Sequence, residues 1–246
     1  MSGGPGPGEE GVPLPSADSS TEDTLDLKLP PEVLALFAAT PPGPTDTVER
    51  VGPAARADLL DSVAGWAATA TPAGSFRLVP VDVARDLALI ARWMNDPAVA
   101  EFWELAGGPD VTEAHLRAQL NGDGRSLPCL GVLDGAPMSY WEIYRADLDP
   151  VARFYPARPH DTGLHLLIGG VADRAHGLGS TLLRTVSELV LDHRPACGRV
   201  VAEPDLRNTP SVAAFLTAGF RFSAEVELPG KRAALMIRDR ALRDLL

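Results

Sequence analysis

Residues Thr162–Ser187 read TGLHLLIGGVADRAHGLGSTLLRTVS. A short apolar run, Leu164–Ile168, leads through a Gly-Gly turn to a second glycine-rich loop, Arg174–Gly179, after which an amphipathic segment begins. Glycines let the backbone approach a ligand closely, and the free N–H groups and dipole of a helix N-terminus favour a bound anion. The stretch therefore predicts a strand, a loop and a helix that together bind a phosphate group.

One histidine, His165, interrupts the apolar strand, and two explanations fit it. It is either a hydrogen-bonded core residue or a functional side chain, and the spacing favours neither. The same choice applies to Asp205, which follows the next expected strand and otherwise caps the turn before Asn208. If the two strands are neighbours, both side chains lie towards carboxyl ends, where open α/β sheets bind ligands.

The composition is typical of an acidic globular protein. The 246 residues are 45% hydrophobic with a net charge of −11, which argues against general nucleic-acid binding. Cys129 and Cys197 match no metal-binding spacing, so we expect free thiols in a reducing cytoplasm and no metal site. The N-terminus lacks a signal-peptide pattern, and no apolar run reaches the roughly 20 residues of a membrane span. We therefore expect a cytoplasmic protein.

The first 50 residues differ from the remainder. They contain nine acidic residues against Lys28 and Arg50, which accounts for −7 of the net charge, and they are rich in Pro and Gly. Such a segment buries too little apolar surface to offset the entropy of ordering it. We expect residues 1–50 to be a largely disordered extension, in which only Leu25–Phe37 docks as a short strand and helical turn. Residues 51–74 then form a helix and linker, and residues 75–246 form the main domain.

Hydrophobic periodicity and turn residues predict an α/β domain with a mixed central sheet of about seven strands flanked by helices. The expected strands are 76–81, 127–133, 136–145, 162–168, 199–202, 220–228 and 232–240. The expected helices are 53–68, 82–94, 112–120, the helix that follows Gly179, and 208–218. Asp134-Gly135 is a hairpin turn, and Asn95-Asp96-Pro97 ends the second helix.

This order of elements resembles the GCN5-related N-acyltransferase (GNAT) fold. The resemblance rests on the RxxGxG loop at 174–179 and on Asn208 followed by Ala218-Gly219-Phe220. It implies that the loop holds the pyrophosphate of acyl-CoA and that the next strand and helix form the other side of the cofactor cleft. The cofactor-binding residues expected from it are Arg174, Gly177, Leu178, Gly179, Ser180 and Asn208.

A narrower resemblance is to the hydroxamate-siderophore acyltransferases, the group of the aerobactin, alcaligin and mycobactin enzymes. It covers about residues 75–242 and is carried by WMNDP at 93–97, SYWEIY at 139–144, GLHLLIG at 163–169, VAEPDLRN at 201–208 and LPGKRAALM at 228–236. In that group the strand histidine and the aspartate after the next strand are the proposed catalytic pair. The resemblance therefore implies that His165 and Asp205 are catalytic.

The implied reaction transfers an acyl group from acyl-CoA, or from an acyl carrier protein, to an amine or N-hydroxyamine of a lysine, cadaverine or ornithine type. A histidine suits the role of base, and a carboxylate would orient its ring. Phe215 stands where many GNAT enzymes have a tyrosine acid, so the leaving thiolate needs another proton source. Acetyl-CoA is the first expectation for the donor, with succinyl and long-chain donors left open.

An aromatic group with one carboxylate is expected to bind the acceptor amine, because stacked rings and a negative charge suit an ammonium. Its members are Trp103, Tyr140, Trp141 and Glu142. Alternate residues of that strand are equally compatible with a core position. A siderophore synthetase and an amine monooxygenase are the expected pathway partners. Two other hypotheses stay open: a GNAT enzyme acting on another small-molecule or protein amine, and a non-catalytic acyl-CoA-binding module.

Overall fold

The computed structural model describes residues 60–174 and 176–245. The expected extension of residues 1–50 and the beginning of the first expected helix lie outside these residues. The part of that helix that is described, Leu60–Gly65, is a short 3₁₀ helix named η1.

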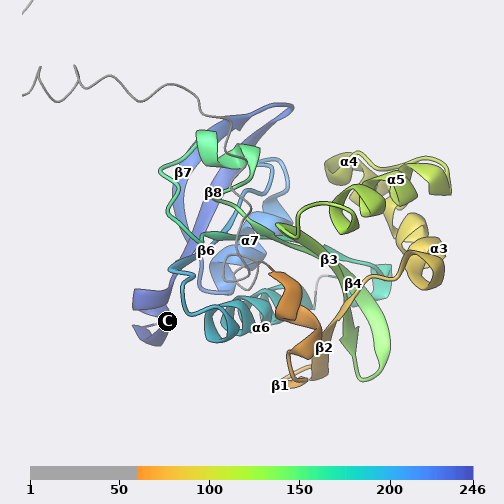
Figure 1. Cartoon of the computed structure of the whole chain (residues 1–246), viewed down its shortest axis with the longest axis horizontal. Coiled ribbons are helices and arrows are strands. Elements are labelled where there is room, and N and C mark those ends of the chain that lie inside the picture. The colour runs from red at the N-terminus through yellow and green to blue at the C-terminus, as the bar shows by residue number, and fades with distance from the viewer. Residues whose placement is uncertain (1–59, 175, 246) are drawn as a thin grey trace, which may run out of the picture. The chain divides into compact units, whose positions relative to one another are not determined.

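Eight strands of the described residues form one mixed sheet (Figure 1). They are β1 (Thr69–Thr71), β2 (Gly74–Pro80), β3 (Ser126–Leu133), β4 (Ala136–Arg145), β5 (Thr162–Ile168), β6 (Arg199–Ala202), β7 (Arg221–Leu228) and β8 (Lys231–Asp239). Their spatial order is β1-β2-β3-β4-β5-β6-β8-β7, and only β5 and β6 pair in parallel. The expected mixed sheet is confirmed, with β1 as an additional strand that is too short to show an alternating pattern.

The helices of the described residues flank this sheet. They are α3 (Val83–Met94), α4 (Pro97–Trp103), α5 (Pro109–Leu120), α6 (Leu178–His193) and α7 (Thr209–Thr217), with short 3₁₀ turns η2 (Pro150–Arg153), η3 (Val171–Asp173) and η4 (Arg240–Leu245). Asp82 caps α3 as expected, because its side chain accepts from the N–H of Arg85. The Asp96-Pro97 pair ends one helix and also begins the next, since Asp96 caps α4 and Pro97 occupies its first turn.

The hairpin between β3 and β4 turns at Asp134-Gly135, as the sequence predicts. Both residues have positive φ angles, 46° and 83°, which fits a two-residue turn of type I′. The turn pairs Leu133 with Ala136, and a bulge between Gly131 and Val132 then shifts the register by one residue, so that Trp141 lies opposite Cys129 and Tyr140 lies opposite Leu130. Alternate residues of β4 therefore point to opposite faces of the sheet.

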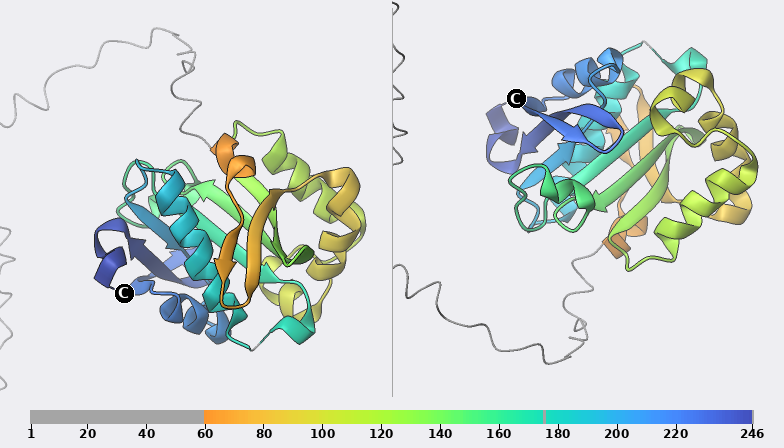
Figure 2. Two further views of the ribbon diagram at one scale, coloured as in Figure 1. Left: turned by 90° about the horizontal axis from the view of Figure 1, so that it is seen from below. Right: turned by 90° about the horizontal axis from the view of Figure 1, so that it is seen from above.

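One face of the sheet is covered by η1, α6 and α7 (Figure 2). Its apolar core includes Trp66, which directly follows η1, together with Trp141 of β4, Leu182 of α6 and Phe215 of α7. Burial of this continuous apolar surface is the main stabilising contribution. Among the described residues, no helix has both the length and the apolarity to cross a lipid bilayer.

The opposite face carries two separate apolar clusters. Helices α3, α4 and α5 pack on Leu130, Tyr140 and Leu167 in one half of the sheet. The loop between β4 and β5 covers the other half, where Tyr155 packs near Leu235 of β8. Polar side chains of β4 and β5 lie where these two clusters approach each other.

Candidate active site

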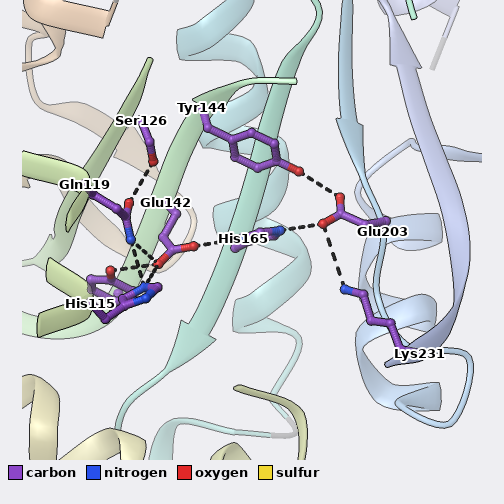
Figure 3. Close-up of polar contacts among 9 residues, drawn as sticks. His115, Gln119, Ser126, Glu142, Tyr144, His165, Glu203 and Lys231 are labelled. Carbon is purple, nitrogen blue, oxygen red and sulfur yellow. Dashed lines mark hydrogen bonds and ion pairs between the residues drawn. The ribbon is translucent and has the colours of Figure 1, made fainter. Parts of the chain in front are cut away.

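Three ionisable side chains form a row across neighbouring strands (Figure 3). Glu142 of β4 lies directly opposite His165 of β5 in the antiparallel register. Glu203 follows β6 and lies on the other side of the same histidine. The Nδ1 of His165 is 2.8 Å from Oε2 of Glu142, and its Nε2 is 2.6 Å from Oε1 of Glu203.

The row crosses the point where the parallel strands separate. The pairing of β5 with β6 consists of Thr162 with Val200 and Gly163 with Val201. His165 and Glu203 each follow the last pair by two residues, so their side chains bridge strands whose backbones no longer pair. A cleft of about 260 Å³ opens here, and its lining includes both residues as well as Phe215.

Glu142 is buried and accepts hydrogen bonds from several groups besides His165. His115 and Gln119 of α5 donate to its Oε1 at 2.5 and 2.7 Å, and the hydroxyl of Tyr140 donates to the same oxygen at 3.0 Å. Burial opposes ionisation of this carboxyl, but the hydrogen bonds and charges of His115 and His165 outweigh it and hold the pKa of Glu142 well below its usual range.

Glu203 is satisfied in the same way. The hydroxyl of Tyr144 donates to its Oε2 at 2.8 Å, and the ammonium of Lys231 lies 3.9 Å from its Oε1. A Cβ on Gly163 would lie 2.0 Å from the Tyr144 ring, so glycine is required for this ring to reach Glu203. Burial favours the neutral acid, but the charge and hydrogen bond of His165, with Lys231 and Tyr144, lower the pKa of Glu203 to about 2.

The hydrogen-bond geometry favours the imidazolium form of His165. A carboxylate has no proton to donate, so both ring nitrogens must carry one to satisfy Glu142 and Glu203. Burial alone would lower the pKa of His165, but the two carboxylates outweigh it and raise this pKa to about 10. The ring is therefore not a free base in this arrangement. Its positive charge is stabilised by the two carboxylates, and it can donate a proton.

The carboxylate partner of His165 differs from the expected one. Asp205 lines the same cleft, but its carboxylate accepts from the guanidinium and backbone N–H of Arg207. These hydrogen bonds, led by that of the guanidinium, lower the pKa of Asp205. The expected His165–Asp205 pair is thus corrected to His165–Glu203. The reason is that Glu203 has the same offset from the last strand pair as His165, whereas Asp205 lies two residues further on.

The aromatic residues expected around the acceptor fall into three positions. Trp103 and Glu142 line the cleft. Tyr140 is fully buried behind them, where its ring meets Trp103 edge-on and its hydroxyl supports Glu142. Trp141 lies on the other face of the sheet, in the core with Phe76, so its expected role in substrate binding is corrected to a structural one. The physical reason is the alternation of side chains along β4.

The glycine loop has the geometry of an anion site. Gly177 is the N-cap of α6 with a φ of 73°, a conformation that favours glycine. Leu178, Gly179 and Ser180 form the first turn, and no side chain caps their N–H groups. A Cβ added at Gly179 would lie 3.9 Å from that of Ala214, an ordinary contact, so the packing of α6 on α7 does not itself require glycine here. These N–H groups are the ones that a pyrophosphate would accept from.

The side chains of Arg174 and Asn208 make hydrogen bonds within the protein. The guanidinium of Arg174 donates to the carbonyls of Ile168 and Gly169 and pairs with Asp96 at 3.2 Å. It therefore holds the end of β5 to the start of α4, and its expected contribution of charge to the phosphate site stays a prediction. The side-chain oxygen of Asn208 caps α7, and Asn208 also lines the cleft.

Four polar residues of the site were not found from the sequence: His115, Gln119, Glu203 and Lys231. Glu203 and Lys231 lie in quoted motifs, yet nothing in their spacing separates them from their charged neighbours Asp205 and Arg232. His115 and Gln119 are four residues apart on α5, which places them on one helix face. That spacing could have indicated a shared polar partner. Only the packing of α5 against β3 and β4 shows that this partner is Glu142.

Comparison with known proteins agrees with this geometry. The sequence profile of the acetyltransferase (GNAT) domain matches residues 82–228. Lysine N-acyltransferase MbtK from Mycobacterium sp. (strain MCS) is 37% identical over 160 residues, which is 65% of each chain. N(6)-hydroxylysine O-acetyltransferase from Escherichia coli is 37% identical over 166 residues, 68% of this chain and 52% of that one. The chain thus spans less than two thirds of either relative's own length.

A solved structure shows the same fold. An uncharacterised protein from Bacillus halodurans superposes with a TM-score of 0.64 and 34% identity, covering 70% of this chain and 86% of that one. The profile match spans more than half of the chain and includes β5, the glycine loop and every residue that lines the cleft except Lys231. A second lysine N-acyltransferase MbtK, from Mycolicibacterium paratuberculosis (strain ATCC BAA-968 / K-10), is 37% identical over 192 residues, 76% of this chain and 85% of that one. The chain therefore belongs to the GNAT family, and within it to the siderophore acyltransferase group that its motifs resemble.

Proposed function

We propose that this protein transfers an acyl group from acyl-CoA to the side-chain amine or N-hydroxyamine of a lysine-, ornithine- or cadaverine-like acceptor in hydroxamate siderophore biosynthesis. The observation that carries the proposal is the imidazolium of His165, held between Glu142 and Glu203 where β5 and β6 separate. The names of the two relatives, a lysine N-acyltransferase and an N(6)-hydroxylysine O-acetyltransferase, support the same class of acceptor.

The donor would bind through the N-terminus of α6. The uncapped N–H groups of Leu178, Gly179 and Ser180 are suited to the pyrophosphate of CoA, and Gly177 provides the left-handed turn that exposes them. Asn208 would contact the pantetheine arm, since it lines the cleft beside Glu203. Acetyl-CoA is the first donor to test, and an acyl carrier protein would present the same arm.

The protonation of His165 favours the N-hydroxyamine as nucleophile. An alkylammonium has no lone pair and must lose a proton before it attacks, and an imidazolium cannot take that proton. A hydroxylamine nitrogen is much less basic, so it arrives neutral and attacks directly. After attack the nitrogen becomes strongly acidic, so that even a carboxylate with a low pKa, such as Glu203, can accept its proton.

The same imidazolium would act on the leaving group. Phe215 lines the cleft but has no hydroxyl to donate, whereas His165 carries a proton and a positive charge. In the balanced reaction the carbon–sulfur bond breaks, the carbon–nitrogen bond forms, and the proton lost by nitrogen replaces the one that His165 gives to the thiolate. Asp205, held by Arg207 in the cleft wall, would face the acceptor.

The test uses the purified full chain with acetyl-, succinyl- and long-chain acyl-CoA. Each donor is paired with lysine, N6-hydroxylysine, cadaverine and N-hydroxycadaverine. Thiol release reports turnover, and the colour of the iron(III) complex identifies a hydroxamate product. We expect turnover with an N-hydroxyamine to exceed that with the parent amine. Absence of thiol release with every pair, from protein that binds CoA, would overturn the proposal.

A further inference from the structure

Lys231 is placed at one end of the cleft. It begins β8, directly after the turn that joins β7 to β8, and its side chain points towards Glu203 (Figure 3). It is one of two lysines in the chain, the other being Lys28. The side chain is 32% exposed and lines the cleft, so its ammonium is partly withdrawn from water and still open to a ligand.

Glu203 has its hydrogen bonds without this ammonium, which contributes only its charge. Its oxygens already accept from His165 at 2.6 Å and from Tyr144 at 2.8 Å, whereas Lys231 lies 3.9 Å away, beyond hydrogen-bond distance. Within the part of the chain that the structure describes, the Lys231 ammonium has this ion pair and no hydrogen bond. A partly buried ammonium with unused donors favours an anionic partner.

A second cation near the cleft, the guanidinium of Arg207, already has partners. Arg207 pairs with Asp205 at 2.8 Å, and its guanidinium lies over the ring of Phe102. On the opposite side of His165, the row ends in Glu142 and His115. Lys231 is therefore the end of the row beyond Glu203, and its ammonium lines the cleft without a hydrogen bond to any residue that the structure describes.

We propose that Lys231 binds a carboxylate carried by one of the two reactants. This inference rests on the proposed function, which places the reacting nitrogen and thioester at His165. A carboxylate at the far end of a reactant could then reach Lys231 from two sources. One is the α-carboxylate of an amino-acid acceptor, and the other is the terminal carboxylate of a dicarboxylic acyl group. The chemistry of recognition is the same in both cases.

The experiment compares reactant pairs that differ by a single carboxylate. N6-hydroxylysine is set against N-hydroxycadaverine, and succinyl-CoA against acetyl-CoA. Lys231→Met removes the charge but keeps an unbranched side chain, and Lys231→Arg keeps the charge. Arg232→Met is the matched control, because Arg232 is the next residue and pairs with Glu225 and Glu227 outside the cleft.

Loss of one charge-assisted hydrogen bond predicts a roughly 10- to 100-fold lower kcat/KM for Lys231→Met with the carboxylate-bearing reactant, and a much smaller change with its counterpart. Selective loss with N6-hydroxylysine assigns the subsite to the acceptor, and selective loss with succinyl-CoA assigns it to the donor. Lys231→Arg should restore most of the selectivity. An equal loss with all pairs would mean that Lys231 only neutralises Glu203, and that result would overturn the proposal, as would no loss.

Binding measurements separate this proposal from the proposed function. Calorimetric titration of N6-hydroxylysine into the CoA-loaded full chain, and of succinyl-CoA into the free chain, needs no turnover. If neither reactant reacts but Lys231→Met weakens one of them by roughly 10-fold or more, the carboxylate site stands and the proposed reaction fails. If turnover occurs and Lys231→Met leaves both affinities and all rate ratios unchanged, the reaction stands and the carboxylate site fails.

Discussion

The two faces of β4 carry opposite chemistry although their residues alternate along one strand. Trp141 and Ile143 point into the apolar core beneath α6, and the indole Nε1 of Trp141 donates to Ser139 on the same face. Tyr140 and Tyr144 point to the other face, where each hydroxyl donates to a carboxylate, one to Glu142 and one to Glu203. The first face is thus stabilised mainly by packing, whereas the second combines apolar clusters around Tyr140 and Tyr144 with a set of hydrogen bonds to buried carboxylates.

The difference shows how buried charge is tolerated beside an apolar core. Glu142 and Glu203 are both nearly inaccessible, yet the donors around them and the shared imidazolium of His165 satisfy their oxygens. Removing a single member leaves an uncompensated buried charge, which costs more than the intact pair contributes. Substitutions on the core face should therefore change stability, and substitutions on the cleft face should change turnover in addition to stability.

The largest expected effect is on the core face. Trp141→Ala leaves a cavity among large apolar side chains, so we expect the free energy of unfolding to fall by about 3–5 kcal/mol. Trp141→Phe keeps most of the volume and should leave the acceptor KM within a few-fold of wild type. Urea unfolding and steady-state kinetics measure the two quantities.

Trp103→Ala is the matched change on the cleft side, because Trp103 lines the cleft and is only partly buried. It should raise the acceptor KM with a smaller loss of stability than Trp141→Ala. A selective increase of the acceptor KM in Trp141→Phe, with stability retained, would return Trp141 to the substrate site and contradict the division between the two faces.

The next effect is on turnover. His165→Gln keeps two hydrogen-bonding groups but removes the charge and the transferable proton, so we expect kcat to fall by roughly 10²-fold or more. His193→Gln is the control, because this histidine stacks on Trp66 at the last residue of α6. Single-turnover measurement of thiol release separates the chemical step from product release.

The partner assignment can be tested in the same assay. Glu203→Gln should lower kcat more than Asp205→Asn, because Glu203 is bonded to the imidazolium and Asp205 is bonded to Arg207. The reverse order would restore the pair that the sequence motifs favour. Near-wild-type turnover of His165→Gln would remove the imidazolium from the mechanism.

Much of this fold is predictable from local sequence. The Asp-Gly turn, the capping Asp82 and the glycine at the start of α6 each determine backbone geometry within a few residues. Seven strands follow from alternation and turn residues, whereas β1 is only three residues long and gives no periodic signal. The position of His165 in a strand beside the glycine loop also follows from the sequence.

The partners within the site are not predictable in this way, because they depend on where strands stop pairing. The sequence VAEPD offers Glu203 and Asp205 on the same side of an extended segment. The choice between them is made by the two-pair register of β5 with β6, which is a long-range property. For Trp141 and Tyr140 the alternation was visible, but the sequence does not say which face of the sheet carries the cleft.

The smallest expected effect is on the pH dependence of stability. The folded-state pKa of His165, about 10, lies above its ordinary value of 6.5. The stabilisation that His165 contributes to the fold is therefore complete below about pH 6.5 and is lost as the pH rises towards 10. The pKa of Glu203, lowered from 4.5 to about 2, has the opposite consequence, since its contribution is lost as the pH falls from 4.5 towards 2. The row should stabilise the fold most between these ranges.

Urea unfolding of wild type and His165→Gln at about pH 6 and about pH 9 measures how much stabilisation by His165 is lost as the pH rises. Most other groups titrate alike in both proteins, so their effects cancel in the difference. We expect the stability difference to shrink at the higher pH by an amount on the order of 1 kcal/mol, since His165 reaches the open cleft and water screens its charge. A difference that stays constant would mean that His165 keeps its ordinary pKa of 6.5 in the folded protein and is a neutral imidazole at pH values above it. One ring nitrogen would then be free to act as the base. His165 would accept a proton from the nucleophile and would not be a permanent proton donor.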